Sequence, residues 1–338
     1  MLVVTPNLTF DVTVRLPALI PGAVVRASET VTTGGGKGVN VVRASTARGL
    51  RGTRLLGFLP ADDGDRLATV LAGESVELVG VPATGAVRVC TIFLEDDGRT
   101  TVVNGRGPQI TGEQWDAFLA AVTNELRAGE VLVCSGSLPP GVPVDGYGRL
   151  VELAHAKGSP AVVDAAPAAL EAALPYRPDL VCPNLSEAEG LLHGRVDEQV
   201  HESGDDLPER AAAAAAALHE RGAVRAVVTA GAAGAALATA DGRWWLTAPP
   251  VEVVSPIGAG DSFVGGAAPA LAAGRADLDI VIDGMATASA SVEQLLAGGV
   301  DPARVPAIAA LITVQRLSSE RPDNTPDRQS DPIPASRR

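Results

Sequence analysis

Apolar residues recur along much of the chain with the period of an amphipathic helix. One such stripe follows the glycine-rich residues 258–260, at positions i, i+1, i+4, i+5 and i+8: Phe263, Val264, Ala267, Ala268 and Leu271. This spacing matches a helical period of about 3.6 residues, so we expect a helix that begins at the glycines. The valine-rich segment Val251 to Val254, which precedes them, is predicted to be a strand.

Short apolar runs alternate with helical patterns over most of the sequence. This alternation predicts right-handed crossovers and a mainly parallel sheet covered by helices on both faces, with the functional site at the carboxyl ends of its strands. The predicted strands are Leu2 to Thr5, Arg54 to Phe58, Val131 to Cys134, Ala161 to Asp164, Asp179 to Cys182 and Val224 to Thr229. The predicted helices are Lys37 to Arg48, Asp63 to Ala72, Gly112 to Arg127, Asp145 to Lys157, Ser186 to Leu192 and Asp206 to His219.

A second kind of strand has one polar and one apolar face. Phe10 to Arg15 and Val24 to Thr32 alternate in this way, and Val87 to Glu95 and Arg99 to Asn104 form a hairpin about a turn at residues 96–98. We expect these pieces, within about residues 9–33 and 85–105, to form a small sheet that projects from the main body. The folded body is predicted to span residues 1–317, and the proline-rich, weakly apolar residues 318–338 to be a disordered tail.

Composition narrows the class of protein. The chain has 338 residues, of which 46% are hydrophobic, and its formal net charge is -13. This charge argues against a nucleic-acid surface, and the start of the chain shows neither a signal peptide nor a membrane span, so we expect a cytoplasmic protein. The three cysteines, Cys90, Cys134 and Cys182, are widely spaced in strand-like runs and are expected to be buried free thiols.

The stretch Gly258, Ala259, Gly260 and Asp261 carries the clearest candidate chemistry. The glycines leave backbone N–H groups of the first helical turn free to bind an anion, and the helix dipole favours negative charge there. Asp261 is placed to accept the proton of a substrate hydroxyl, as phosphoryl transfer requires. The alternative is a tight turn with an aspartate that caps the helix. The stretch is neither a dinucleotide fingerprint nor a P-loop, because the residues that follow do not match either motif.

A second glycine stretch, residues 32–44, also leads into a helical pattern and also fails the P-loop test, because Lys37 is followed by Gly38. Together the two stretches resemble the two signatures of the ribokinase-like (PfkB) sugar kinase family. Four further segments resemble motifs of that family in the same order: Thr5 to Asp11, Ser135 to Gly141, Pro183 to Glu187 and Val228 to Gly231. The resemblance as a whole covers about residues 1–315.

The resemblance implies a three-layer α/β fold with a lid sheet, ATP and Mg²⁺ as cofactors, and a homodimer formed through the lid. It implies no nucleic-acid or membrane partner. By resemblance, the sugar is bound by Asp11, Gly35, Gly36, Lys37, Asn40 and Ser135. The nucleotide phosphates and Mg²⁺ are met by Asn184 and by Glu187, the latter through water, and the nucleotide also by Thr229, Gly231 and Gly234. A helix start with an acidic first turn is the alternative for Asn184 and Glu187.

Arg88 bears on the substrate. Strand alternation puts it on the covered face of its strand, where a guanidinium needs an anion. In the phosphosugar branch that the chain resembles, the 1-phosphofructokinase and tagatose-6-phosphate kinase branch, Arg88 and Arg26 match residues that contact the phosphate on the sugar. A structural salt bridge is the alternative.

We therefore predict ATP-dependent phosphorylation of a ketohexose phosphate, with fructose 1-phosphate as the first choice. Fructose 6-phosphate, tagatose 6-phosphate, an unphosphorylated sugar or a nucleoside are alternative substrates, and a non-catalytic sugar-phosphate-binding regulator is an alternative of another class. Three departures from the family pattern, Cys182, Pro256 and Pro269, leave nucleotide affinity and the geometry of the helix that contains Asp261 open.

Overall fold

The computed structural model of the chain describes residues 1–194, 204 and 206–317. The tail predicted for residues 318–338 lies outside the described residues.

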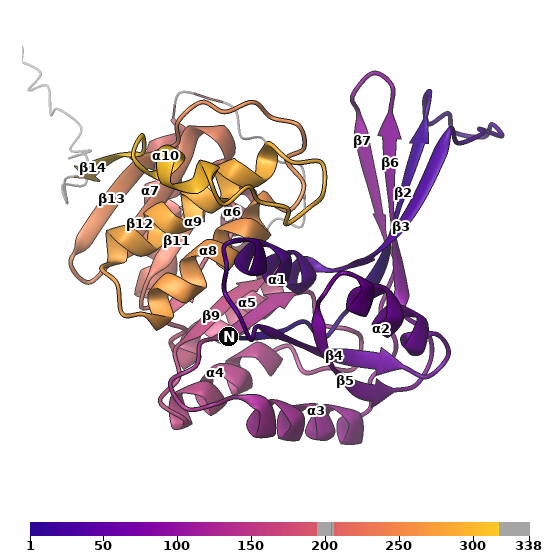
Figure 1. The fold of residues 1–338 in the computed structure, drawn as a ribbon. Helices are drawn as coiled ribbons and strands as arrows, with labels where there is room; N and C mark the ends of the chain where they lie inside the picture. Colours follow the sequence, from indigo (N-terminus) through magenta and orange to yellow (C-terminus); the bar gives the residue numbers. More distant parts are fainter. Residues whose placement is uncertain (195–203, 205, 318–338) are drawn as a thin grey trace, which may run out of the picture.

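The body is built on a ten-stranded sheet (Figure 1). In sheet order its strands are β14 (Thr313–Leu317), β13 (Gly242–Thr247), β12 (Gly234–Thr239), β11 (Ala226–Thr229), β10 (Leu180–Val181), β9 (Ala161–Ala165), β8 (Leu132–Gly136), β1 (Leu2–Val4), β4 (Arg54–Pro60) and β5 (Glu77–Ala83). The strands from β11 to β5 are parallel to their neighbours, whereas β12, β13 and β14 extend the sheet in antiparallel fashion. The mainly parallel sheet predicted from the alternation of elements is confirmed.

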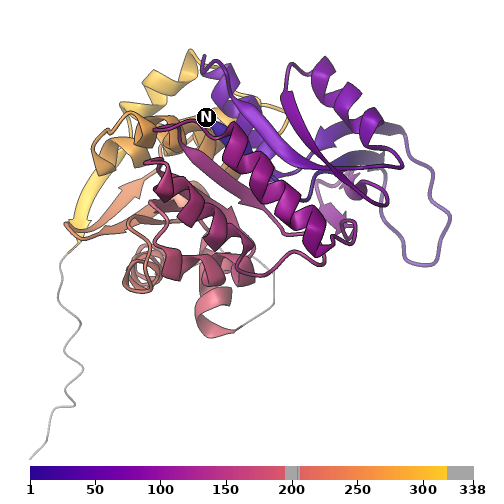
Figure 2. The same ribbon diagram turned by 90° about the horizontal axis from the view of Figure 1, so that it is seen from below.

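Helices cover both faces of this sheet, and Figure 2 shows the layer that contains α3 and α4 from below. One layer comprises α3 (Gly112–Glu125), α4 (Gly146–Ala156), α5 (Pro167–Ala173), α6 (Leu185–His193) and α7 (Leu207–Glu220). The other comprises α1 (Lys37–Ala47), α2 (Gly64–Gly73), α8 (Ala259–Ala272) and α9 (Asp277–Val292), and α10 (Arg304–Ala309) packs beside α9. Successive side chains of a strand point to opposite faces of the sheet, so each strand contributes to the hydrophobic core on both sides. In β1, Leu2 and Val4 pack on the side of the first layer and Val3 on the side of the second. The three-layer α/β fold expected from the sequence is therefore confirmed.

Two short 3₁₀ turns, η1 (Leu174–Tyr176) and η2 (Gly231–Ala233), complete the body. None of the described helices is long and apolar enough to cross a membrane. The three cysteines are buried free thiols, as expected.

A second sheet projects from the body as predicted (Figure 1). Its order is β3 (Glu29–Gly35), β2 (Thr9–Leu16), β6 (Arg88–Glu95) and β7 (Thr100–Asn104). The outer pairs are antiparallel hairpins, and the central strands β2 and β6 are parallel, with Asp11 opposite Cys90 and Thr9 opposite Arg88. We call this four-stranded sheet the lid.

Two predicted strand segments are wrong. Residues 24–28 are not part of β3, which begins at Glu29. They belong to a connection that contains Pro17, Pro21 and Gly22 (φ +80°), and these residues favour a turn over the hydrogen-bonded pairing of two strands. Val251 to Val254 is not a strand either. The N–H groups of Val254 and Ser255 donate instead to the carbonyl of Val292, at the end of α9.

Candidate functional site

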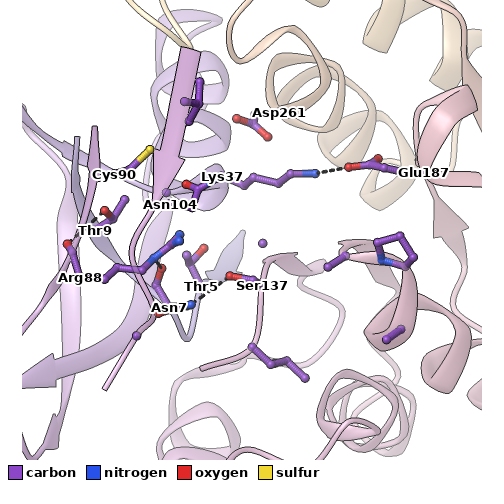
Figure 3. A pocket seen from close by; sticks show the side chains of 18 of the residues that line it. Thr5, Asn7, Thr9, Lys37, Arg88, Cys90, Asn104, Ser137, Glu187 and Asp261 are labelled. Carbon is purple, nitrogen blue, oxygen red and sulfur yellow. Dashed lines mark hydrogen bonds and ion pairs between the residues drawn. The ribbon is translucent and has the colours of Figure 1, made fainter. Parts of the chain in front are cut away.

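A cavity of about 1030 Å³ lies between the lid and the body. Side chains from both parts line it (Figure 3). The lid contributes Asp11 and Arg88, the start of α1 contributes Lys37, α6 contributes Glu187 and the start of α8 contributes Asp261. Residues that are distant in the sequence but carry complementary charges therefore meet in one pocket.

Asp261 lies in the first turn of α8 and is only 7% exposed. Gly258, the residue before this helix, has φ +81°, which explains why the turn needs glycine. The start of α8 has no side-chain cap. The N–H of Ala259 donates to the carbonyl of Pro256 over 3.3 Å, which leaves the N–H groups of Gly260 and Asp261 for an anion. The Nδ2 atom of Asn40 donates to Oδ2 of Asp261 over 2.8 Å. Burial raises the pKa of Asp261 to about 7, against the opposing effect of nearby Lys37.

Lys37 lies at the centre of a cluster of carboxylates. Its Nζ atom is 3.2 Å from Oδ1 of Asp164, at the end of β9, and 3.4 Å from Oε1 of Glu187. Burial lowers the pKa of Lys37, but the two carboxylates outweigh this effect and raise it above its usual range. Burial also raises the pKa of Asp164. With Asp261 nearby, three carboxylates face one lysine, so the cluster carries an excess of negative charge when all are ionised.

Asn184 and Glu187 form a capping box at the start of α6. The Oδ1 atom of Asn184 accepts from the N–H of Glu187 over 2.8 Å, and Oε2 of Glu187 accepts from the N–H of Asn184 over 3.0 Å. The other oxygen, Oε1, faces Lys37. The two sequence alternatives therefore coexist, since the helix start is capped and Glu187 still lines the pocket.

On the lid, Asp11 packs against the backbone of the glycine stretch. A Cβ atom added at Gly35 would lie 2.1 Å from Cγ of Asp11, so only glycine lets the carboxylate approach this closely. Burial raises the pKa of Asp11 to about 6, while the charge of Arg88 acts in the opposite direction. The carboxylate lines the cavity, where it can accept hydrogen bonds from sugar hydroxyls.

Arg88 is fixed at one point and leaves its remaining donors for a ligand. Its Nε atom donates to the carbonyl oxygen of Asn7 over 3.1 Å, and Nδ2 of Asn7 donates to Oγ of Ser137 over 3.0 Å. Burial lowers the pKa of Arg88, because the guanidinium is partly desolvated. Figure 3 shows the guanidinium beside Asn7, on a different part of the pocket wall from Asp261. Such a group favours an anionic partner.

Residues 2–304 match the model of a protein family that is described as pfkB family carbohydrate kinase. The chain belongs to the pfkB family. It is therefore an enzyme that transfers a phosphoryl group to an alcohol group of a carbohydrate, and the resemblance inferred from the sequence is confirmed.

Solved structures of several sugar and sugar-phosphate kinases are similar to this one over almost the whole chain. Phosphofructokinase-2 from Escherichia coli in complex with potassium is 27% identical with a TM-score of 0.81, over 92% of this chain and 98% of that one. A possible 1-phosphofructokinase from Thermotoga maritima is 24% identical, with a TM-score of 0.77 and coverage of 94% and 99%. Ribokinase from Thermotoga maritima is 21% identical, with a TM-score of 0.71 and coverage of 91% and 99%; these last two likenesses concern the fold.

The pocket of this pfkB kinase does not contain every residue that the sequence suggested. Arg26 is exposed in the connection between β2 and β3 and is not among the residues that line the cavity. Ser135 is fully buried in β8, and Ser137, two residues further on, lines the cavity in its place. The described lining residues do not include Gly35, Gly258, Ala259, Gly260, Thr229, Gly231 or Gly234 either.

The structure gives some of these residues another explanation. A Cβ atom at Gly234 would lie 2.0 Å from the carbonyl oxygen of Leu246, so this glycine is required by the pairing of β12 with β13. Thr229 ends β11 and bridges to Asn184, which places it next to the start of α6.

Sequence reasoning missed Asp164 and Arg106, both of which the structure brings to the site. Asp164 carried a usable signal, because it closes a predicted buried strand whose carboxyl end must face the site. Arg106 follows the lid hairpin in an irregular segment, where no periodicity shows its direction.

Membership of the family implies the use of ATP, generally together with a divalent metal, and the residues present fit both groups. A Cβ atom at Gly260 would meet no atom within 4 Å, so the space in front of the α8 start is open. Oδ2 of Asp164 is buried and accepts no well-formed hydrogen bond from the described residues. Among the described residues, no group of three or more His, Cys, Asp or Glu side chains is arranged to ligate one metal ion. Because Mg²⁺ keeps several waters when it binds to proteins, a divalent cation beside Asp164 and Glu187 would be held largely through water.

The pKa of Asp261 leads to a prediction about pH. A base must be deprotonated to act, so we expect kcat/KM for the sugar to rise with pH through about 7, where Asp261 ionises in the free enzyme. Asp11, with a pKa of about 6, becomes protonated at lower pH, which adds a second ionisation to the acid side of the profile. A pH profile between about pH 5 and pH 9 checks this. In the Asp11→Asn variant, kcat/KM should still rise with pH through about 7. A kcat/KM that is constant across this range would contradict the role of Asp261.

Proposed function

We propose that this pfkB kinase transfers the γ-phosphoryl group of ATP to a hydroxyl of a ketohexose phosphate. The observation that supports this best is the arrangement of one pocket in which a buried carboxylate, Asp261, and an uncapped helix start lie across from a guanidinium, Arg88. The first pair suits the reacting hydroxyl and the phosphoryl group. The guanidinium suits a phosphate that is already on the sugar.

In this proposal each side chain has a separate task. Asp261 accepts the proton of the sugar hydroxyl, and the N–H groups at the start of α8 stabilise charge on the transferring phosphoryl group. Lys37 adds positive charge beside them, and Asp11 orients the sugar hydroxyls from the lid. A bound Mg²⁺ supplies further neutralisation of phosphate charge. Its water shell would be held by Glu187 and Asp164, which have carboxylate oxygens directed toward the cluster.

We name fructose 1-phosphate as the first substrate to test. Fructose 6-phosphate is the second, because phosphofructokinase-2 from Escherichia coli, 27% identical to this chain, has been solved in complex with fructose-6-phosphate. Both sugars carry a phosphate remote from the hydroxyl that reacts, so Arg88 and Arg106 suit either one. A panel of these sugars with tagatose 6-phosphate and fructose, with ADP release as the readout, separates them.

We also propose that the protein is cytoplasmic and forms a homodimer through the lid. Exposed valines occur on both faces of the lid. Val31 and Val102, 46% and 47% exposed, lie on the face of Asp11, and Val89 and Val103, 44% and 54% exposed, lie on the other. A tetrameric inhibited form has been described for phosphofructokinase-2 from Escherichia coli. Analytical ultracentrifugation of the chain tests this part of the proposal.

The test of the substrate assignment is the Arg88→Ala variant. A charge-assisted contact in a partly desolvated pocket is worth on the order of 1.5 to 3 kcal/mol, so the KM for the sugar phosphate should rise about ten- to a hundredfold. Part of this binding energy also positions the sugar, so kcat should fall as well. The KM for ATP should stay unchanged. Steady-state kinetics with the preferred sugar phosphate and with fructose measures these effects.

Two controls make the result specific. Fructose lacks the phosphate, so its low kcat/KM should be almost indifferent to Arg88→Ala. Arg99→Ala is the matched variant, because Arg99 lies at the other end of the same hairpin, is 64% exposed and pairs with Glu95 and Asp97 outside the pocket. If Arg88→Ala weakens fructose and the sugar phosphates equally, Arg88 is structural and the phosphosugar assignment is wrong.

A further inference from the structure

A chain of hydrogen bonds leads from Asp261 into the body, away from the pocket. Asn40 donates to Asp261, and Nη1 of Arg43 donates to Oδ1 of Asn40 over 2.9 Å. Asn40 is 6% exposed and lines the pocket, whereas Arg43 lies behind it. Asn40 and Arg43 are three residues apart on α1, so they share a face of that helix. The helix itself lies between α2 and α8 (Figure 1).

Arg43 fixes which end of the Asn40 amide faces Asp261. An amide group has an acceptor oxygen and a donor nitrogen, and a guanidinium can only donate. The bond from Arg43 therefore holds Oδ1 on its own side and turns Nδ2 toward the carboxylate. With the amide reversed, Oδ1 of Asn40 would face Asp261, and two acceptors would repel each other.

Arg43 is itself held rigidly. Each of its five N–H groups has an acceptor: Nε and Nη2 donate to Oε2 of Glu74, Nη2 also to the carbonyl of Gly34 over 2.8 Å, and Nη1 to Asn40 and, over 3.5 Å, to the carbonyl of Ala297. Its side chain is 9% exposed. The acceptors come from the end of α2, from β3 and from the loop after α9. A lysine, with three donors on one nitrogen, cannot replace this arrangement.

The loop after α9 also bears on the start of α8. A Cβ atom at Gly298 would lie 2.6 Å from the carbonyl oxygen of Asn40, and one at Gly258 would lie 3.0 Å from Cβ of Ala297. This loop thus packs against both Asn40 and the turn that precedes Asp261. The position of the helix start and the direction of the amide are set by the same set of contacts.

We propose that Arg43 is a positioning residue for the proton acceptor of the reaction: by fixing the amide of Asn40, it holds Asp261 ionised and correctly oriented. The proposal rests on the function proposed above, in which Asp261 is the base. Arg43 does not touch substrate, and its effect is transmitted through Asn40.

The groups around Asp261 give the expected direction of the effect. Asp164 from β9 and Glu187 from α6 disfavour its charged form, whereas Lys37 and Asn40 from α1 favour it. Loss of the oriented Asn40 bond removes one of the two favourable contacts. The pKa of Asp261 should then rise above 7, and the acid limb of kcat/KM should move to higher pH by about one unit.

The experiment is a double-mutant cycle with Arg43→Gln, Asn40→Ala and the combination of both. Arg43→Gln is expected to lower kcat about tenfold at pH 7, with little change in the KM for ATP and with the acid limb displaced upward. In the Asn40→Ala background, Arg43→Gln should cost less than about twofold in kcat, because its route to Asp261 has been removed. Arg43→Lys should behave like Arg43→Gln, since it lacks the fork that holds the amide.

Arg48→Gln is the matched control. Arg48 also joins α1 to a neighbouring element, with Nη1 3.1 Å from Oγ1 of Thr287 and Nη2 3.4 Å from Asp283. Its loss should lower the unfolding temperature without moving the pH profile. If Arg43→Gln does the same, or if the effects of Arg43→Gln and Asn40→Ala on kcat simply multiply, Arg43 only stabilises the fold and the proposal is overturned.

A readout that does not depend on turnover separates this proposal from the proposed function. Carbon-13 NMR of labelled aspartates, with Asp261→Asn used to assign the resonance, gives the pKa of Asp261 in the folded protein. An upward shift in both Arg43→Gln and Asn40→Ala supports the positioning role even if the wild-type protein phosphorylates no sugar in the panel. An unchanged pKa in Arg43→Gln overturns it even if kinase activity is established.

Discussion

Replacing Asp261 by asparagine is expected to lower kcat by roughly 10² or more, the scale of a lost general base, with the KM for the sugar little changed. Asparagine keeps the size of the side chain but cannot accept the proton. The bond from Asn40 also changes, because one oxygen acceptor remains where two equivalent ones stood. Coupled ADP detection at pH 8 measures the effect. Turnover near that of wild type would show that the proton goes elsewhere.

Stability measurements show whether this loss reflects unfolding. The pKa of Asp261 is raised in the folded state, so its ionised form is destabilising there. The stability that Asp261 contributes is present below its unfolded pKa and is lost as pH rises through about 7. At pH 8, Asp261→Asn should therefore unfold at the same temperature as wild type or higher. A much lower unfolding temperature would mean that the side chain is a structural cap.

Replacing Gly260 by valine is expected to be at least as damaging to kcat/KM for ATP, by a different route. A Cβ atom at Gly260 meets no protein atom within 4 Å, so the folded protein has room for it. That same room is where the transferring phosphoryl group must approach the N–H groups of α8. We expect a folded protein that has lost at least about a hundredfold in kcat/KM, as when an oxyanion donor is removed.

Gly112→Val is the matched control for this substitution. Gly112 is the first residue of α3, and a Cβ atom there also meets nothing within 4 Å, but this residue does not line the pocket and its helix belongs to the opposite layer. Both variants should show similar small changes in unfolding temperature. A fully active Gly260→Val enzyme would place the phosphoryl group away from the start of α8.

Much of the fold could be predicted because the signals are local. The helix from Ala259 shows its apolar stripe within one segment, and its glycine turn fixes where Asp261 points. The strands of the parallel sheet read as short buried runs, and the rule that their carboxyl ends share one edge brought Asn184 and Glu187 toward the site. The lid hairpin was visible from strict alternation about a turn.

What escaped prediction depends on contacts between distant segments. The parallel pairing of β2 with β6 joins segments about eighty residues apart, and the hydrophobic pattern of each strand does not indicate its partner. Strands β12 to β14 at the edge of the sheet were not anticipated. Val251 to Val254 is apolar enough for a strand, yet the N–H of Val254 donates to the carbonyl of Val292 at the end of α9 instead. The family resemblance implied that Arg26 contacts the phosphate of the sugar. In the structure, this residue is exposed in the connection between β2 and β3.

The division of the pocket between lid and body has a consequence for how such an enzyme changes over evolutionary time. Asp11 and Arg88 stand on lid strands, whereas Lys37, Asp164 and Asp261 belong to the body. On the function proposed above, substitutions on the lid would alter which sugar is accepted while Asp261 and the start of α8 stay as they are. A change at Asp261 would instead lower turnover for every sugar. New acceptor preferences can thus arise by drift in two hairpins, without passing through forms that have lost the reaction.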